Sequence, residues 1–371
     1  MREIKIVHVI NSLGGGGLER RMLECVKGLG LDKQYSQHVI LLYDIIDYPD
    51  IYDTNADVVR LSSRSKLNKG NELIKIISKI EPDIVHLWTC SLITLPVYLC
   101  KQSLGYKIIA GFIADGNPIN SPVYKFALRY FSKKADKIVS NSKAGIIAKR
   151  APEEKSVVIY NGFSFDRFKN FPTYDKETIK KEIGVTTKFI VSMNARFYPA
   201  KDWKTFLEIV KKVEDVRQDV IFLAVGQGNQ LRHYKNVAEG MGLKNLIFTG
   251  FRKDIDKIYF ISDVCVLCTN EKVHAEGVSN AIMEAMAAGK PVIATMGGGT
   301  PEIIENGHNG IIICPHDSDE GAKVILRLVS DDSYRLSLGN FAMETIKQRF
   351  TLSSMVDRYK IIYQSLLELD M

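Results

Sequence analysis

Residues 4–17 read IKIVHVINSLGGGG, an apolar run that ends in four consecutive glycines. The run from Ile4 to Ile10 is short, rich in β-branched residues and typical of a buried strand. Leu18, Met22 and Val26 follow at helical spacing, so a helix is expected directly after the glycines. These residues predict a strand, a tight glycine turn and an amphipathic helix.

The same alternation of strand-like runs and helical patterns extends along the whole chain of 371 residues. It predicts parallel sheets covered by helices. In the first half we expect strands at Ile4–Ile10, His38–Leu42, Val58–Leu61, Ile84–Leu87, Lys107–Ile113, Lys137–Ser140 and Val157–Tyr160. In the second half we expect them at Phe189–Met193, Ile221–Val225, Leu246–Thr249, Val264–Cys268, Pro291–Ala294 and Ile311–Cys314. The fold class is therefore α/β, with two Rossmann-like, doubly wound parallel-sheet domains.

The chain is expected to divide into an amino-terminal domain at 1–165, a carboxy-terminal domain at 166–350 and a last helix within 351–371. The stretch 161–187 is polar and shows no period, which favours a linker. The last helix could cap either domain. Ligands of such sheets bind outside the carboxyl ends of the strands, so two facing sheets predict a site in the cleft between the domains.

Composition excludes several classes of protein. With 46% hydrophobic and 25% charged residues, the chain is neither disordered nor fibrous. The apolar run 92–100 is about half of what a bilayer crossing needs, and the amino terminus lacks the pattern of a secretion signal. Six cysteines are too few for a disulfide framework, and Cys265 with Cys268 fits core packing on a strand better than a metal or redox pair. We expect a cytoplasmic protein.

The net charge of +7 is concentrated in one segment, because residues 101–170 carry 13 Lys or Arg and 5 Asp or Glu. Within this segment Lys125, Arg129, Lys133 and Lys137 recur every fourth residue beside apolar positions. A helix there would present a basic stripe. The stripe is either a solvated helix face or a contact with an anionic membrane surface or a phosphate-bearing substrate.

The glycines at 14–17 allow close approach of a ligand, and amides at a helix amino terminus attract phosphate. Leu18, Glu19 and Arg20 follow the glycines, so the segment is neither a dinucleotide fingerprint nor a nucleotide-triphosphate loop. A tight strand-to-helix turn without a ligand is the alternative.

The second half opens with a pair of cations. Arg196 stands at the carboxyl end of an expected strand, and Lys201 lies five residues on, near the start of a helix. A guanidinium fork with an ammonium suits a diphosphate and would stabilise negative charge on a departing diphosphate group. Ordinary surface ion pairing is the alternative.

Residues 276–291 read EGVSNAIMEAMAAGKP and carry two glutamates. Ser279 is a good amino-terminal cap, and Gly289 with Pro291 ends the helix. Glu276 then lies in the loop before the helix and Glu284 lies within it. Amides at the helix start can hold phosphate or sugar hydroxyls, and carboxylates accept hydrogen bonds from vicinal hydroxyls such as those of a ribose.

This segment resembles the paired-glutamate motif of the retaining, GT-B-fold glycosyltransferases of family 4, the glycosyl transferases group 1. The resemblance covers almost the whole chain. Besides the glycine loop, the two glutamates and the Arg-Lys pair, it includes Ser140-Asn141-Ser142, Asn161-Gly162, Gly226-Gln227-Gly228, Gly250-Phe251-Arg252-Lys253-Asp254 and Gly297-Gly298-Gly299-Thr300-Pro301-Glu302. The occurrence of all these motifs in this order is a more specific signal than any single motif.

The resemblance implies a role for each matching residue. Arg196 and Lys201 would bind the donor diphosphate, Glu276 the transferred sugar and Glu284 the ribose. By the same resemblance, the amides of Gly277, Val278 and Ser279 would approach the sugar and phosphates. Phe251 and Arg252 would lie beside the base. Gly15 and Gly16 would face the donor phosphate and the acceptor. It also implies an amino-terminal acceptor domain, a carboxy-terminal donor domain, and no cofactor or metal, because Arg and Lys take the metal's place.

The sequence departs from the family at one place. Many relatives carry a histidine at the end of an amino-domain strand beside the reacting sugar, and residues 110–116, AGFIADG, contain none. Asp115 is the candidate for that position. His86, near a strand end, would face the site or be a hydrogen-bonded core histidine.

We therefore expect a retaining, metal-independent hexosyltransferase. It would move a hexose or amino-hexose from a nucleotide-diphosphate sugar, with UDP as the favoured nucleotide, to an acceptor hydroxyl. The acceptor would be a lipid-linked or soluble saccharide in surface polysaccharide biosynthesis, reached from the inner membrane face by a peripheral protein; no nucleic acid is expected as a partner. The alternatives are a sugar-nucleotide epimerase of the same fold and a catalytically silent sugar-nucleotide-binding subunit.

Overall fold

The computed structural model describes residues 2–112, 122–273 and 276–368. The chain forms two compact units, one made of Met1–Gly162 with Leu352–Met371 and the other of Phe163–Thr351. Asp115, the candidate for the missing histidine, lies outside the described residues.

The first unit contains a seven-stranded parallel sheet in the order β3-β2-β1-β4-β5-β6-β7. Its strands are β1 Ile4–Ile10, β2 Tyr35–Leu41, β3 Asp57–Arg60, β4 Ile84–Leu87, β5 Lys107–Gly111, β6 Lys137–Ser140 and β7 Ser156–Val158. Its helices are α1 Gly17–Leu29, α2 Lys66–Ile80, α3 Leu95–Leu104, α4 Pro122–Lys134, α5 Lys143–Ala148 and α14 Leu352–Leu366. Starting from β1, the chain adds β2 and β3 on one side and β4 to β7 on the other, as in a doubly wound sheet.

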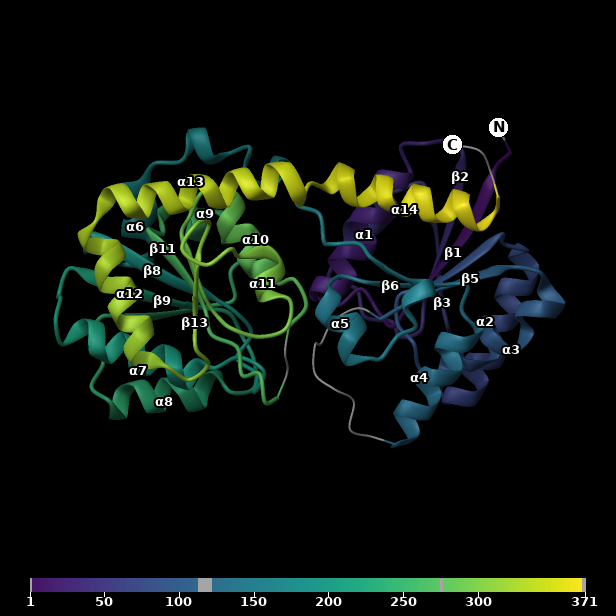
Figure 1. The fold of residues 1–371 in the computed structure, drawn as a ribbon, viewed down its shortest axis with the longest axis horizontal. Coiled ribbons are helices and arrows are strands. Elements are labelled where there is room, and N and C mark those ends of the chain that lie inside the picture. Colours follow the sequence, from purple (N-terminus) through teal and green to yellow (C-terminus); the bar gives the residue numbers. More distant parts are fainter. Residues whose placement is uncertain (1, 113–121, 274–275, 369–371) are drawn as a thin grey trace. The chain divides into compact units, whose positions relative to one another are not determined.

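Two cores cover the two faces of this sheet. Ile6 and Ile10 of β1 pack in one core with Met22 of α1 and Tyr359 of α14. Val7 belongs to the opposite core, because successive side chains of a strand point to opposite faces. Helix α14 thus packs beside α1 (Figure 1), although α1 ends at Leu29 and α14 begins only at Leu352.

The second unit contains a six-stranded parallel sheet in the order β10-β9-β8-β11-β12-β13. Its strands are β8 Phe189–Asn194, β9 Val220–Val225, β10 Leu246–Gly250, β11 Val264–Leu267, β12 Val292–Thr295 and β13 Ile311–Ile313. Its helices are α6 Lys176–Ile183, α7 Trp203–Glu214, α8 Leu231–Gly240, α9 Ile255–Ile261, α10 Asn280–Ala287, α11 Thr300–Ile303, α12 Ser318–Ser330 and α13 Asp332–Arg349. Helices lie on both sides of this sheet as well (Figure 1).

Both predicted parallel sheets are confirmed, and each expected strand overlaps an observed one. The stretch 161–187 differs from the expected linker, because it contains α6, whose Ile179 is buried in a core with Ile190 and Ile258. Cys265 and Cys268 are both buried, and burial raises the pKa of the Cys265 thiol to about 11. These two cysteines are core residues.

The basic stripe is shorter than predicted. Lys125, Arg129 and Lys133 are exposed on α4, but the helix ends at Lys134 and Lys137 begins β6. Lys137 is therefore not part of the helical stripe, because residues on a strand do not continue the period of the helix before it. In the described parts of the chain, every helix is too short or too polar to cross a bilayer.

Candidate functional site

Helix α10 begins where the sequence predicts. Ser279 is its amino-terminal cap residue and has an extended backbone, but its side chain makes no capping hydrogen bond. Ile282, Met283 and Met286 are buried and anchor the helix to its own unit. The packing of these three side chains thus holds the helix that carries Glu284 and the loop before it, which carries Glu276.

A glycine turn after β12 supports the Glu276 backbone. The amide of Gly299 donates to the Glu276 carbonyl oxygen at 2.7 Å. Gly298 has a φ of +50°, and a Cβ added there would lie 1.8 Å from the same oxygen. Only glycine can take both this backbone conformation and this close approach. The glycines at 297–299 therefore set the position of Glu276.

The Lys201 ammonium forms an ion pair with Oε1 of Glu276, and both side chains are mostly buried, at 13% and 18% exposure. The backbone of Lys201 is held by a bridge to Thr269. The next residue, Asp202, caps α7 by accepting a hydrogen bond from the Thr205 amide at 3.1 Å. The loop before α7 and the loop before α10 are thereby joined through a cation and a carboxylate.

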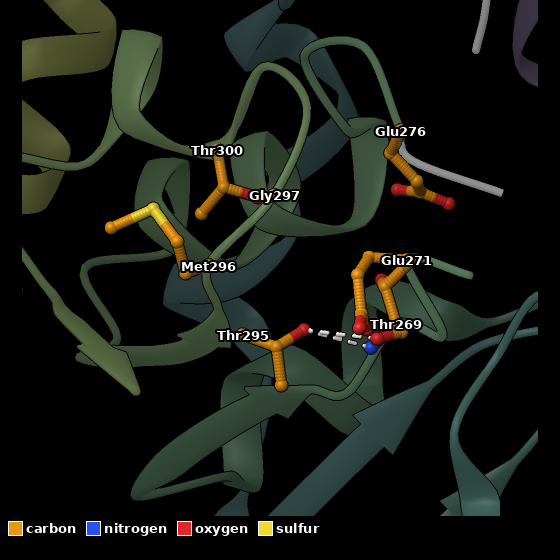
Figure 2. A pocket seen from close by; sticks show the side chains of 7 residues that line it. All are labelled: Thr269, Glu271, Glu276, Thr295, Met296, Gly297 and Thr300. Atoms are coloured by element: carbon orange, nitrogen blue, oxygen red, sulfur yellow. Dashed lines mark hydrogen bonds between the residues drawn. The ribbon is translucent and has the colours of Figure 1, made fainter. Parts of the chain in front are cut away.

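Glu276 also lines a small pocket, together with Thr269, Glu271, Thr295, Met296, Gly297 and Thr300 (Figure 2). The hydroxyl of Thr295 accepts from the Thr269 amide at 2.9 Å, which joins the ends of two neighbouring strands. The Oε2 atom of Glu271 is buried without a hydrogen bond, although Nε2 of His316 lies 3.5 Å away. The pocket wall is therefore rich in groups that can accept hydrogen bonds from sugar hydroxyls.

The second glutamate of the motif, Glu284, is held by two donors. Nη1 of Arg167 donates to Oε1 at 2.9 Å, and the Tyr259 hydroxyl donates to Oε2 at 3.0 Å. Burial, with the nearby Glu284 charge, raises the pKa of Tyr259 well above its ordinary value, so the tyrosine keeps its proton. Two protein groups thus fix the plane of this carboxylate.

Arg196 follows β8 and is exposed. Its carbonyl oxygen accepts from Nε1 of Trp203 at 3.1 Å, and the Trp203 ring stacks on Phe197 at 3.8 Å between centroids. Arg196 and Lys201 consequently lie on one rigid turn between β8 and α7.

The remaining residues of the second unit that are assigned to the donor lie on two loops. Gly277 and Val278 are buried directly after Glu276. Phe251 follows β10 and is 61% exposed, and Arg252 pairs with Asp254 through contacts of 2.9 and 2.6 Å.

In the first unit, the glycine turn leads from β1 into α1 as predicted. The Gly15 amide donates to Oδ2 of Asp47 at 2.8 Å, so a carboxylate already contacts an amide assigned to phosphate. His86 is a core residue, since it is fully buried and its Nδ1 lies 2.8 Å from the Tyr363 hydroxyl. Of the two alternatives for His86, a residue that faces the site or a hydrogen-bonded core histidine, the structure shows the second.

Sequence reasoning missed Arg167, Glu271 and Asp47. No local pattern marks them, because each reaches its partner or pocket through the fold rather than through a motif. Among the residues that the structure describes, no three His, Cys, Asp or Glu side chains are grouped to hold a metal ion.

The chain is similar in sequence to known glycosyltransferases. The family described as "Glycosyl transferases group 1" matches residues 175–345, which lie within the second unit. The chain is 22% identical over 341 residues to N-acetyl-alpha-D-glucosaminyl L-malate synthase of Bacillus anthracis, covering 87% of this chain and 86% of that protein. It is 30% identical over 215 residues to UDP-Gal:alpha-D-GlcNAc-diphosphoundecaprenol alpha-1,3-galactosyltransferase of Escherichia coli, covering 56% and 54%.

Coverage differs among the curated relatives. The alignments with four of them span 59%, 86%, 59% and 54% of the relative's own length. The crystal structure of Anabaena Alr3699/HepE in complex with UDP-glucose matches with a TM-score of 0.84 at 22% identity, covering 98% of this chain and all of that one. This match confirms the GT-B fold. Together, the family match over residues 175–345 and the named relatives support a glycosyltransferase.

Proposed function

We propose that the protein is a retaining glycosyltransferase of family 4 that transfers a hexose or amino-hexose from a UDP-sugar to an acceptor hydroxyl. The observation that carries the proposal is the ion pair of Lys201 with Glu276 beside a hydroxyl-lined pocket. The second unit would bind the donor and the first unit the acceptor. The Escherichia coli relative is named for a UDP-sugar donor, which favours the same donor class here.

In this proposal the two cations stabilise the leaving group. Arg196 and Lys201 bind the diphosphate and stabilise the charge that grows on it as the sugar departs. Glu276 binds the sugar hydroxyls and holds the Lys201 ammonium when no donor is bound. Because two cations supply the positive charge, the reaction is expected to proceed without a metal.

Other contacts would orient the donor. The amides of Gly277, Val278 and Ser279 approach the sugar and phosphates, and Phe251 with Arg252 borders the base. Glu284 accepts hydrogen bonds from the ribose. Gly15 and Gly16 are assigned to the donor phosphate and the acceptor, and Asp115 to the acceptor hydroxyl.

The retained configuration follows from attack on the same face of the sugar. The bond from the anomeric carbon to the phosphate oxygen breaks, and a bond to the acceptor oxygen forms. The acceptor proton moves to the departing phosphate oxygen. The protein's part is then to position both substrates and to stabilise the diphosphate.

For the acceptor we propose a lipid-linked saccharide in surface polysaccharide assembly, reached by peripheral contact with the inner membrane face. Lys125, Arg129 and Lys133 are exposed on α4 beside Phe126, which is 75% exposed. Cations around an exposed aromatic ring suit an anionic lipid surface. The relative from Escherichia coli is named for a diphosphoundecaprenol-linked acceptor.

A panel of sugar nucleotides tests the activity. A UDP-hexose should raise the melting temperature, because ligands that bind the folded state stabilise it, and should be consumed only when an acceptor is added. The product's anomeric configuration, measured by NMR, should equal that of the donor. Release of an altered sugar without acceptor would instead identify an epimerase, and binding without transfer to any saccharide a silent subunit.

A further inference from the structure

Arg167 stands beside the proposed donor site, but no motif of the sequence assigns it a role. It lies in a short 3-10 turn, Phe165–Phe168, at the start of the second unit. Its side chain is ion-paired with Glu284, and the two side chains are 25% and 12% exposed. A carboxylate buried to this degree needs a compensating cation, and Arg167 supplies it.

The backbone that carries Arg167 is held by aromatic packing. The Phe168 ring stacks on Phe171 at 4.4 Å between centroids and meets Tyr259 edge-on at 6.2 Å. The guanidinium of Arg167 lies 5.2 Å from the centre of the Phe163 ring. Arg167 and Tyr259, which both donate to Glu284, therefore belong to one packed cluster.

The two donors approach different oxygens of the same carboxylate, Arg167 at Oε1 and Tyr259 at Oε2. This arrangement fixes both the position and the plane of the Glu284 carboxylate. A carboxylate offers about four acceptor sites, so a carboxylate oriented in this way can also receive hydroxyl donors from a ligand. Two vicinal hydroxyls require a carboxylate with such a fixed plane, since both must donate to that carboxylate at the same time.

We infer that Arg167 is a positioning residue for nucleotide recognition, which holds the Glu284 carboxylate in the orientation that accepts the ribose hydroxyls of the donor. The inference rests on the proposed function, because it takes the ligand of Glu284 to be a ribose. Arg167 itself need not touch the nucleotide. Its removal should therefore abolish selection for the hydroxyls rather than binding in general.

The experiment compares UDP with 2′,3′-dideoxy-UDP by isothermal titration on the full chain. The wild type should bind UDP about tenfold or more tightly, because hydrogen bonds to a charged group are strong. Arg167→Gln should bring the ratio of the two affinities close to one, as Glu284→Gln should. Arg167→Lys should restore part of the ratio, and Tyr259→Phe should lower it with the ring packing kept.

Arg217→Gln is the matched control, since Arg217 forms a two-contact pair with Asp219 at 2.9 and 2.7 Å before β9, at the opposite end of the sheet from the loop of Glu276. It should leave the ratio unchanged. A wild type that does not discriminate between the two nucleotides, or does not bind UDP, would overturn the role of Glu284 in the proposed function and this inference with it. Wild-type discrimination that is lost in Glu284→Gln but survives Arg167→Gln would overturn the inference alone.

Discussion

The Lys201 ammonium is ion-paired with the Glu276 carboxylate across two loops that are 75 residues apart in the sequence. In the proposed enzyme this pair is the resting form of the donor site. A diphosphate would engage the ammonium, and the sugar hydroxyls would engage the carboxylate.

Removing either cation should impair catalysis far more than folding. Arg196→Ala or Lys201→Ala is expected to lower kcat by about a hundredfold or more, because one preorganised group can contribute about 10²–10³ in rate. Transfer from the donor is measured at saturating substrate. Lys204→Ala is the control, since Lys204 lies one turn further on with 77% exposure; near-normal turnover in both cation variants would contradict the role.

The glycine turn offers a test of how Glu276 is positioned. Gly298→Ala and Gly307→Ala both place alanine at a positive φ, +50° and +81°, and this backbone conformation alone costs about 1–2 kcal/mol of stability in each. Only at Gly298 would the new Cβ meet the Glu276 carbonyl; at Gly307 nothing lies within 4 Å.

We therefore expect Gly298→Ala to lower kcat/KM by about a hundredfold, since a displacement of about 1 Å at a catalytic group can cost that much. Gly307→Ala should keep nearly normal kcat/KM. Equal kinetics for the two variants would show that the position of Glu276 does not depend on this turn.

Two buried histidines predict acid sensitivity. Nδ1 of His8 accepts from Nε1 of Trp88 at 3.1 Å, so a proton on Nδ1 would break this bond. Burial lowers the pKa of His8 to about 4 and that of His86 well below its ordinary value. Between pH 6.5 and about 4 the unfolded chain binds more protons than the folded one, so stability falls as the pH is lowered.

Each histidine can contribute up to about 1.4 kcal/mol per pH unit to this loss. Calorimetric melting temperatures between pH 7.5 and 4.5 measure it. His8→Asn should flatten the acid slope, whereas His233→Asn, at an exposed position of α8, should not. An unchanged slope in His8→Asn would refute the prediction.

The basic face of α4 predicts membrane contact. Replacing Lys125, Arg129 and Lys133 by Gln should weaken binding to vesicles rich in phosphatidylglycerol by about a hundredfold, at about 1 kcal/mol per cation. Vesicle sedimentation measures the affinity. The control replaces three lysines of α7, Lys204, Lys211 and Lys212, and has the same net charge; equal losses in both triple variants would contradict a docking surface on α4.

Most of the fold could be predicted from the sequence, because the central strands are continuous apolar runs such as Val220–Val225, which is buried throughout. Helix α6 was missed because only Ile179 and Ile183 mark its buried side. The sequence assigns Lys137 both to the basic stripe, because the spacing of four continues past the end of α4, and to a strand; the structure confirms the strand.

The site could be predicted only where a local motif carries it. Ser279 and Glu284 follow from helix signals and from the family resemblance. Arg167 lies 117 residues from Glu284, and Asp47 lies 32 residues from Gly15. Such partners are decided by sheet order and loop packing, which a single sequence does not specify.

A crystal structure of the protein with a UDP-hexose tests the central claim most directly. The account predicts the diphosphate in contact with Arg196 and Lys201, the hexose at Glu276 and the ribose at Glu284. A nucleotide bound elsewhere, with the Lys201–Glu276 pair undisturbed, would contradict it.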